Sequence, residues 1–338
     1  MFTNNKGLAF ASSSLEKRSD PETTEAESIT KGRIMKYDIG RKQRYRPTTK
    51  SNPATSSGDI QPLIIGGEKV EPDTYPWFVR LTYFGNYWWG CGGSLITPEY
   101  VLTAAHCFLP LDGGDGYDDQ GLGVQIGALK DPFITTNGGQ DPVVYRDAIG
   151  VAIHTDFDDW TAENDFALIH LNERVTSIKP VDVDMNHLSD TYVDGKPNLW
   201  AIGLGFNGYD YSSELMHVEL KYMPNAQCSD IWMSDIPNNM MCAADLGQSS
   251  CFGDSGGPLY DSDSNTLVGI TSWGSEECNS SGVYSRISDQ WDAWIKPIIC
   301  TGHTEPKPDF CRSKHPKGAK TPKAPKNGKK EKKVNADN

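Results

Sequence analysis

The sequence predicts an all-β fold for the middle of the chain, and three observations support it. Val79, Leu81 and Tyr83 alternate with the residues between them, and Gly85-Asn86 follows as a turn, which is typical of paired strands. Residues 166–169 form a short apolar run, as in a buried strand. The third observation is a set of four motifs, described below. The alternation and the turns are only consistent with this fold class.

Composition divides the 338 residues into three parts. Residues 64–300 carry 10 Lys and Arg against 34 Asp and Glu. Residues 1–63 carry 11 against 7, and residues 301–338 carry 11 against 4, so both flanks are basic. We expect a disordered N-terminal pro-region over 1–63 and one folded domain over 64–300. A basic Lys- and Pro-rich extension over 301–338 is expected to be mostly disordered, because its composition is polar.

The acidic middle part excludes some partners. A strongly negative surface repels nucleic acid and anionic membranes and attracts cationic proteins. Solubility in salty surroundings is the simpler explanation of the acidity, and we prefer it. No run of 18 apolar residues is present, so no transmembrane helix is expected.

The segment 249–259 carries the strongest sign of chemistry. It places Ser255 after Gly253 and Asp254 and before two further glycines. Glycines allow tight turns that point consecutive N–H groups into one space, and such a cluster of donors can hold a negative oxygen. Ser255 then stands where its hydroxyl can attack a carbonyl whose oxygen lies in that cluster. The alternative for so short a motif is an ordinary loop.

Three further motifs favour the chemical interpretation. His106 and Cys107 end the segment 102–107, Asp165 lies within residues 164–169, and a Ser-Trp-Gly segment occupies 272–274. The chain order is therefore His, Asp, Ser, as in chymotrypsin. Here the sequence resembles the chymotrypsin-like (trypsin-like) serine endopeptidases, from Ile64 to about residue 295. Four motifs in the family's order make the resemblance specific.

The resemblance implies two six-stranded antiparallel β-barrels with a C-terminal helix and an active site between the barrels. His106 would act as general base, since the pKa of a histidine near ~6.5 suits proton exchange near neutrality. Asp165 would orient His106, and Ser255 would be the nucleophile of an acyl-enzyme mechanism. The N–H groups of Gly253 and Ser255 would form the oxyanion hole. No cofactor and no metal are expected.

The resemblance also indicates the specificity pocket. Its base lies six residues before the nucleophile, where this chain has Ser249 and trypsin-like members have aspartate. We therefore expect cleavage after large apolar residues, because lysine or arginine would lack a charge partner. Glu276 and Glu277 lie nearby in sequence and are the alternative partners for a basic substrate. The expected substrate-binding residues are Ser249, Ser272, Trp273, Gly274 and Gly282.

Activation follows from the same resemblance. Cleavage before Ile64 would free an amino group that pairs with Asp254 and shapes the oxyanion hole and the pocket, so the uncut chain would be a zymogen. The residue before this bond is Leu63, which a trypsin-like activator would not accept. A pocket based on Ser249 accepts leucine, so the enzyme would cut a second copy of itself. The alternative activator is another protease that prefers apolar residues.

The eight cysteines suggest an oxidising compartment. The family pairs Cys91 with Cys107, Cys228 with Cys242 and Cys251 with Cys278, which leaves Cys300 and Cys311 for a local bridge. We expect an extracellular or secretory location, although residues 7–11 are too short and weakly apolar for the core of a signal peptide. Asn279 begins the one glycosylation sequon, whose use the sequence leaves open.

Residues 288–299 predict an amphipathic helix, because the apolar residues at 291, 294, 295 and 298 recur at helical spacing. Ser288 or Asp289 is the expected cap, and Pro297 limits the regularity of the helix. The acidic loop 111–119 offers carboxylates for calcium, but its spacing does not fit an EF-hand, and a solvated loop is preferred.

The expected partners are protein or peptide substrates and an activating protease, and the expected state is a monomer. The second hypothesis is a catalytically silent protease-like module that serves binding or adhesion. Such modules usually lack a triad residue or the oxyanion glycine. His106, Asp165, Ser255 and Gly253 are all present here, which favours the enzyme.

Overall fold

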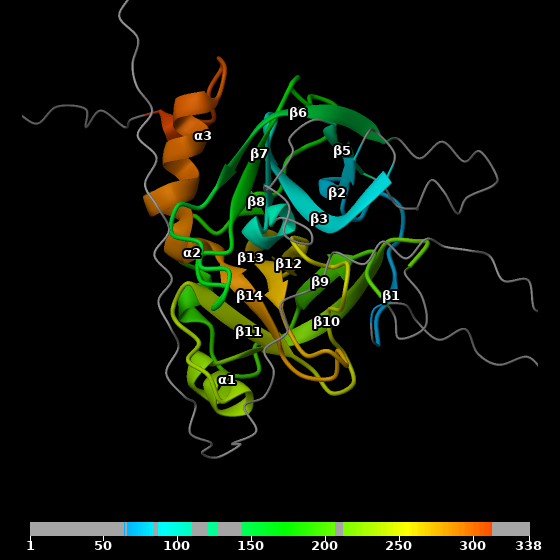
Figure 1. The fold of residues 1–338 in the computed structure, drawn as a ribbon, viewed down its shortest axis with the longest axis vertical. Coiled ribbons are helices and arrows are strands. Elements are labelled where there is room, and N and C mark those ends of the chain that lie inside the picture. Colours follow the sequence, from blue (N-terminus) through cyan, green and yellow to red (C-terminus); the bar gives the residue numbers. More distant parts are fainter. Residues whose placement is uncertain are drawn as a thin grey trace, which may run out of the picture. The chain divides into compact units, whose positions relative to one another are not determined.

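The computed structural model describes residues 64, 66–83, 87–109, 121–127, 143–206 and 212–312, without the side chains of 87–89. Leu63, the pro-region 1–63, the acidic loop 111–119 and the extension beyond residue 312 lie outside the described residues. Strands dominate the described part (Figure 1). No helix within it is both long and apolar enough to cross a membrane.

Six antiparallel strands close the first barrel in the order β2-β3-β4-β7-β6-β5 (Figure 1). Their bounds are Phe78–Tyr83 (β2), Tyr87–Thr97 (β3), Tyr100–Thr103 (β4), Leu122–Ile126 (β5), Val144–Ile153 (β6) and Ala167–Leu171 (β7). The predicted strand after Asp165 is therefore β7, and its apolar residues are buried as expected.

Six further antiparallel strands close the second barrel, in the order β10-β11-β14-β13-β12-β9 with β9 returning to β10. Their bounds are Leu199–Gly203 (β9), Met216–Met223 (β10), Met240–Ala244 (β11), Pro258–Asp261 (β12), Thr266–Trp273 (β13) and Gly282–Arg286 (β14). Two short strands extend this sheet: Glu68–Lys69 (β1) pairs with β10, and Asp182–Val183 (β8) runs parallel to β13. The prediction of two six-stranded antiparallel barrels is confirmed.

Strand β2 differs from the simple alternation that its sequence shows. Val79 and Leu81 are fully buried as expected, but Arg80 and Thr82 are also only 1% exposed. Arg80 Nη1 donates to Gln125 Oε1 on the neighbouring strand, 3.4 Å away. Both faces of β2 are covered, because one faces the barrel interior and the other lies under further protein. A paired polar side chain can occupy such a buried face.

The helices are short. They are Ala105–Phe108 (η1), Ser189–Thr191 (η2), Asn225–Trp232 (α1), Ile287–Gln290 (α2), Trp291–Ile295 (η3), Lys296–Gly302 (α3) and Asp309–Cys311 (η4).

The C-terminal helix is present, with an irregularity at its centre. Trp291, Trp294 and Ile295 of the predicted apolar face are buried. Ile298 is only partly buried, and Ile299, which the spacing did not predict, is fully buried. The turn η3 is π-helical, and Lys296 N–H donates to the Trp291 carbonyl five residues back. A wider turn accommodates the following proline at residue 297, whose ring would clash with the carbonyl four residues earlier in a regular helix.

The predicted cap of this helix is wrong. The helix begins after Arg286, and no side chain caps its first turn. Ser288 Oγ instead donates to Asp190 Oδ1 at 2.7 Å, and Asp289 Oδ2 accepts from the side chain of Gln290. The strand β14 runs directly into the helix, so both residues lie one or two positions inside it rather than at its N-cap.

Four disulfides join all eight cysteines in the predicted pairs: Cys91–Cys107, Cys228–Cys242, Cys251–Cys278 and Cys300–Cys311. The third ties the segment before Ser255 to the loop that follows β13. Four disulfides are consistent with an extracellular or otherwise oxidising compartment.

Candidate active site

His106 and Asp165 form a pair within the first barrel. His106 lies on η1, directly after β4, and Asp165 lies just before β7, the strand that pairs with β4. His106 Nδ1 lies 2.7 Å from Asp165 Oδ2, and the backbone N–H of His106 donates to Asp165 Oδ1 at 2.8 Å. Two hydrogen bonds to one carboxylate fix both the ring and its backbone. This arrangement presents Nε2, the other ring nitrogen, on the far side of the ring from Asp165.

Two serines of the second barrel hold the same aspartate. Ser272 Oγ on β13 donates to Asp165 Oδ2 at 2.6 Å, and Ser285 Oγ on β14 donates to the Asp165 carbonyl at 3.0 Å. Asp165 is completely buried. Burial raises the pKa of this carboxyl, but the charge and hydrogen bonds of His106 and the Ser272 hydroxyl outweigh it, so the pKa is lowered overall. Asp165 is therefore held as a carboxylate.

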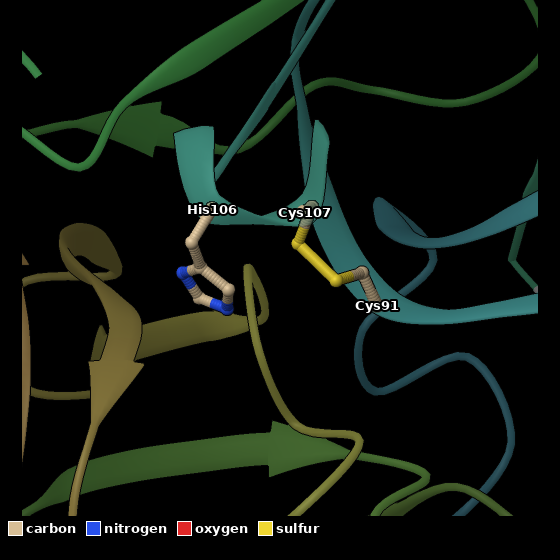
Figure 2. Close-up of side chains that lie close together, drawn as sticks. All are labelled: Cys91, His106 and Cys107. Carbon is tan, nitrogen blue, oxygen red and sulfur yellow. A yellow bond between two sulfur atoms is a disulfide. The ribbon is translucent and has the colours of Figure 1, made fainter. Parts of the chain in front are cut away.

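A disulfide lies beside His106. Figure 2 shows the ring of His106 next to the bond between Cys107, its neighbour on η1, and Cys91 on β3. One ring nitrogen of His106 and the two sulfurs lie within 4.8 Å of one another, which resembles a metal site. However, both sulfurs are joined to each other, and zinc binding requires free thiolates. The cluster therefore stiffens the segment that carries His106.

The segment that carries Ser255 lies against the strand end that leads to His106. The Ser255 carbonyl accepts a hydrogen bond from the Gly92 N–H at 2.8 Å. A Cβ added to Gly256 would overlap Thr103 Oγ1 and lie 3.2 Å from the Ala104 nitrogen. Only a glycine permits this approach, and the positive φ of 73° at Gly256 also favours glycine. The nucleophile candidate and the histidine are thus brought together from different barrels.

The backbone around Ser255 forms a tight turn. Gly253 has a φ of 90°, a value that glycine adopts without steric cost. Asp254 N–H donates to the Cys251 carbonyl, and Gly257 N–H donates to the Asp254 carbonyl. Among the described residues, no backbone carbonyl accepts from the N–H of Gly253 or Ser255. These are the two donors that the sequence predicts for an oxyanion hole.

Asp254 is buried beneath this turn. Its Oδ2 accepts from the Cys251 N–H and its Oδ1 from the Gly205 N–H, both at 2.8 Å. Burial raises the pKa of Asp254 to about 7, against the opposing effect of these two hydrogen bonds. Ile64 is also fully buried, in a cluster of the second barrel that includes Tyr284. Burial is the main cause of the raised pKa of Tyr284, and the negative charge of Asp254 adds to it.

The predicted pocket residues gather around β13 and β14. Ser249 is buried, and its Oγ donates to the carbonyls of Ser250, at 2.8 Å, and Ser280, at 3.3 Å. Ser272 and Trp273 end β13, and Gly274 follows them, while Gly282 begins β14. The side chains of Glu276 and Glu277 are exposed. None of these residues is both charged and buried.

Sequence reasoning missed several supporting residues. Tyr284 hydrogen-bonds to Ser250 through its hydroxyl, and a Cβ on Gly282 would lie 2.8 Å from that hydroxyl oxygen. Trp232 on α1 packs edge-on against Trp273 with ring centroids 4.9 Å apart. Tyr284 follows Gly282 by two residues, so the period of a strand offered a signal for it. No comparable signal marks Trp232, because α1 meets β13 only in the folded chain.

Comparison with known proteins agrees with this geometry. The family model described as Trypsin matches residues 64–295. Kallikrein-1 of Mus musculus is 31% identical over 267 residues, which cover 71% of this chain and 91% of that protein. Serine protease 1 of Drosophila melanogaster is 33% identical over 248 residues, which cover 70% of this chain and 86% of that protein. The chain belongs to the trypsin family and is a chymotrypsin-like serine endopeptidase.

Proposed function

We propose that this enzyme hydrolyses peptide bonds of protein substrates with Ser255, His106 and Asp165 as its catalytic residues. The observation that carries the proposal is the buried Asp165 carboxylate, which binds His106 through two hydrogen bonds. Asp165 fixes the tautomer of the ring, so that Nε2 is the acceptor for the Ser255 proton. Ser255 Oγ then attacks the substrate carbonyl carbon, and an acyl-enzyme forms as the leaving amine takes the proton from His106. Water repeats the cycle and releases the acid.

The backbone N–H groups of Gly253 and Ser255 stabilise the oxyanion of the tetrahedral intermediate. The turn that holds them is fixed by the Cys251–Cys278 disulfide and by the backbone hydrogen bonds of Asp254 and Gly257. Little reorganisation is therefore needed when charge develops on the oxygen. Their lack of a backbone acceptor among the described residues supports this role.

The same geometry supports a zymogen. Cleavage between Leu63 and Ile64 frees an amino group whose positive charge pairs with Asp254. In the uncut chain Asp254 is buried, and the described residues supply two backbone donors to its carboxylate. Its raised pKa of about 7 indicates a site that an ammonium group would satisfy. Leu63 lies outside the described residues, so this step rests on Ile64 and Asp254.

The enzyme prefers large apolar residues before the scissile bond. Support comes from Ser249, whose hydroxyl is satisfied by two carbonyls, and from the exposed positions of Glu276 and Glu277. A lysine or arginine side chain that reached Ser249 would bury its charge without a carboxylate.

A catalytically silent binding or adhesion module is the alternative function. Labelling of the cleaved protein with a fluorophosphonate separates the two, because this reagent reacts only with an activated serine. We expect one label on Ser255. We expect no label on the Ser255→Ala variant or on protein in which cleavage before Ile64 is prevented. Absence of label on correctly cleaved, folded protein would favour the silent module.

A further inference from the structure

Asp165 lies at the centre of a tight turn just before β7. The Phe166 N–H donates to the Asn164 carbonyl at 2.8 Å, which closes a three-residue γ-turn with Asp165 in the middle. In so short a turn, the direction in which the central side chain leaves the backbone depends on its two neighbours. The carboxylate that binds His106 is therefore aimed by the backbone of Asn164.

Asn164 has an uncommon backbone conformation. Its φ is 55°, in the left-handed region, which asparagine adopts more readily than most residues other than glycine. Its side-chain Nδ2 donates to the Asp156 carbonyl at 3.0 Å, so the loop that leads to Asp165 is closed on itself. One end of the Asn164 amide is thus held by the first barrel's own chain.

The second barrel holds the other end of this amide. Asn239 Nδ2 donates to Asn164 Oδ1 at 3.0 Å. Asn239 immediately precedes β11, and its carbonyl accepts from the Arg286 N–H on the paired strand β14 at 2.8 Å. Its backbone is therefore fixed by the sheet of the second barrel, and its side chain reaches the residue next to Asp165.

The contact with Asn239 differs from those of the two serines described above. Ser272 binds the Asp165 carboxylate and Ser285 binds the Asp165 carbonyl, whereas Asn239 binds the residue that precedes Asp165. Consecutive residues of the first barrel are thus bound by two neighbouring strands of the second. A change in this contact would rotate the turn as a unit and displace the carboxylate from His106.

We propose that Asn164 and Asn239 are positioning residues for peptide hydrolysis. Together they hold the turn that aims the Asp165 carboxylate at His106, and they act through Asp165 rather than on the substrate. This role rests on the proposed function, in which Asp165 orients His106. The competing role is purely structural: the pair would join the barrels and stabilise the fold without affecting the hydrogen bond between His106 and Asp165.

Kinetics of the mature enzyme with a short peptide substrate give the first test. Asn164→Gly keeps the left-handed backbone accessible and removes both side-chain hydrogen bonds, whereas Asn239→Ala removes one donor. We expect kcat to fall roughly 10-fold in the first variant and roughly threefold in the second, since neutral hydrogen bonds are lost. KM should change less than about twofold, because neither side chain binds substrate. An unchanged kcat, or a change confined to KM, would overturn the proposal.

The double variant tests whether the two residues act as a pair. Once Asn164→Gly has removed the acceptor, Asn239→Ala has no further hydrogen bond to remove. The double variant should therefore lose no more kcat than Asn164→Gly alone, which is the sign of two coupled positions. Losses that multiply would show that the two asparagines act independently, and would contradict the proposed pair.

Proton NMR of the Ser255→Ala full chain gives a readout that a structural role would not change. The hydrogen bond of 2.7 Å between His106 Nδ1 and Asp165 Oδ2 is short and charge-assisted, so its proton should resonate at low field. We expect this resonance to move or broaden in Asn164→Gly and in Asn239→Ala. An unchanged resonance in both variants would overturn the proposal. Because this measurement needs no turnover, it separates a failure of the positioning role from a failure of the proposed function.

Asn198→Gly is the matched control. Asn198 is also partly buried with a positive φ, of 63°, and its Nδ2 donates to Asp263 Oδ1 at 2.9 Å. This hydrogen bond lies within the second barrel, so the control should leave kcat and the low-field resonance unchanged. Equal effects in Asn198→Gly and Asn164→Gly would contradict a specific role. If Asn164→Gly does not fold, Asn239→Ala alone decides, because it alters no residue of the turn.

Discussion

Ser272 links the two barrels through a hydrogen bond to the charged side chain of Asp165. Its hydroxyl, from the second barrel, donates to the Asp165 carboxylate, which holds His106 in the first. The pKa of Asp165 is lowered despite burial, so its contribution to stability is present above its unfolded pKa and is lost as pH falls through the folded value. Ser272 is one of the few groups that keep this carboxylate charged.

Ser272→Ala should lower kcat/KM by roughly 10- to 100-fold, because a hydrogen bond to a charged group contributes about 1.5–3 kcal/mol. Steady-state hydrolysis of a peptide substrate by the mature enzyme measures the fall. Ser285→Ala is the matched control, since Ser285 Oγ donates to the Asp165 carbonyl rather than to its carboxylate. Equal falls for the two variants would contradict the role given to Ser272.

Ser249 determines a second prediction at this scale. Peptides with Leu, Phe or Tyr before the scissile bond should be cleaved roughly 100-fold faster, in kcat/KM, than those with Arg or Lys. The physical reason is the cost of a buried charge without a partner. A panel of substrates that differ only at this position gives the ratio.

The double variant Glu276→Gln/Glu277→Gln is the control for this ratio. Both side chains are exposed, so the substitution should leave the ratio unchanged. A further loss of cleavage after Arg in this variant would show that these carboxylates, rather than Ser249, govern the pocket.

Sequence alone identifies the residues that act through local motifs and misses those that act through tertiary contacts. Ser255 and its glycines form one continuous turn, so their chemistry is visible in the order of the residues. Ser285 and Thr103 are ordinary strand residues until β14 meets Asp165 and β4 meets Gly256. Their roles depend on contacts between positions about 120 to 150 residues apart, which no local pattern records.

At the scale of elements, the apolar alternation and the family resemblance predicted the strands. They did not predict where the C-terminal helix begins and ends. The apolar spacing predicted burial of Trp291, Trp294 and Ile295, but it pointed to Ile298 where Ile299 is the fully buried residue. The capping prediction failed because a strand runs directly into the helix, which removes the usual N-cap position. The segment after Gly302 gave no signal either, since Glu99 lies about 200 residues earlier in the chain.

The chain after α3 is held to the first barrel by the buried Glu99, whose carboxylate accepts from the Thr304 N–H and lies 3.1 Å from His303 Nδ1 and 3.2 Å from Arg174 Nη1. Glu99→Gln removes the charge that binds Thr304, His303 and Arg174, and should lower Tm by roughly 3–12 °C, for about 1.5–3 kcal/mol. Thermal unfolding of the Ser255→Ala protein near neutral pH measures the change. Burial raises the pKa of Glu99, but the Thr304 hydrogen bonds and nearby positive charges lower it overall, so the effect should diminish as pH falls through the lowered pKa.

Glu173→Gln is the control for this variant. Glu173 is 73% exposed and 3.9 Å from Arg146, and exposed pairs contribute little to stability. An equal loss of Tm in both variants would contradict a specific role for Glu99.

At the scale of the whole molecule, the uncut chain should lose stability and the mature enzyme should lose activity as pH rises, each in a different pH range. In the uncut chain burial raises the pKa of Asp254 to about 7, so the folded state binds a proton that the unfolded state has lost. Stability should therefore fall as pH rises from ~4 to about 7. Thermal unfolding of the Ser255→Ala precursor across this range measures the trend.

Asp254→Asn in the same precursor should remove this contribution, because the amide does not titrate. The proposed pairing with Asp254 in the mature enzyme would raise the pKa of the Ile64 amine above its free value of ~7.7–8.0. Its contribution is complete below the free value and is lost as pH rises through the raised pKa, so activity should fall reversibly in alkali. An identical slope in the Asp254→Asn precursor would contradict this account.

Maturation of one molecule by another is the final prediction. Trace mature enzyme should convert the Ser255→Ala precursor to a form that begins at Ile64, at a rate proportional to the enzyme added. Since Ile64 is fully buried, the bond must first leave the core, and mild denaturant should accelerate conversion. N-terminal sequencing identifies the product. Conversion of the inactive precursor alone, or none with enzyme present, would exclude self-processing.

The division of the site between two barrels also governs when proteolysis can begin during synthesis. His106 and Asp165 belong to a barrel whose last strand ends at Leu171, whereas Ser255 and Ser272 belong to one that closes with β14. Domains fold as the chain emerges from the ribosome, N-terminal part first. A nascent chain therefore carries an aligned histidine and aspartate long before it carries a nucleophile. Under the proposed catalytic roles, chains that lack the second barrel should therefore show no proteolysis, independently of any pro-region.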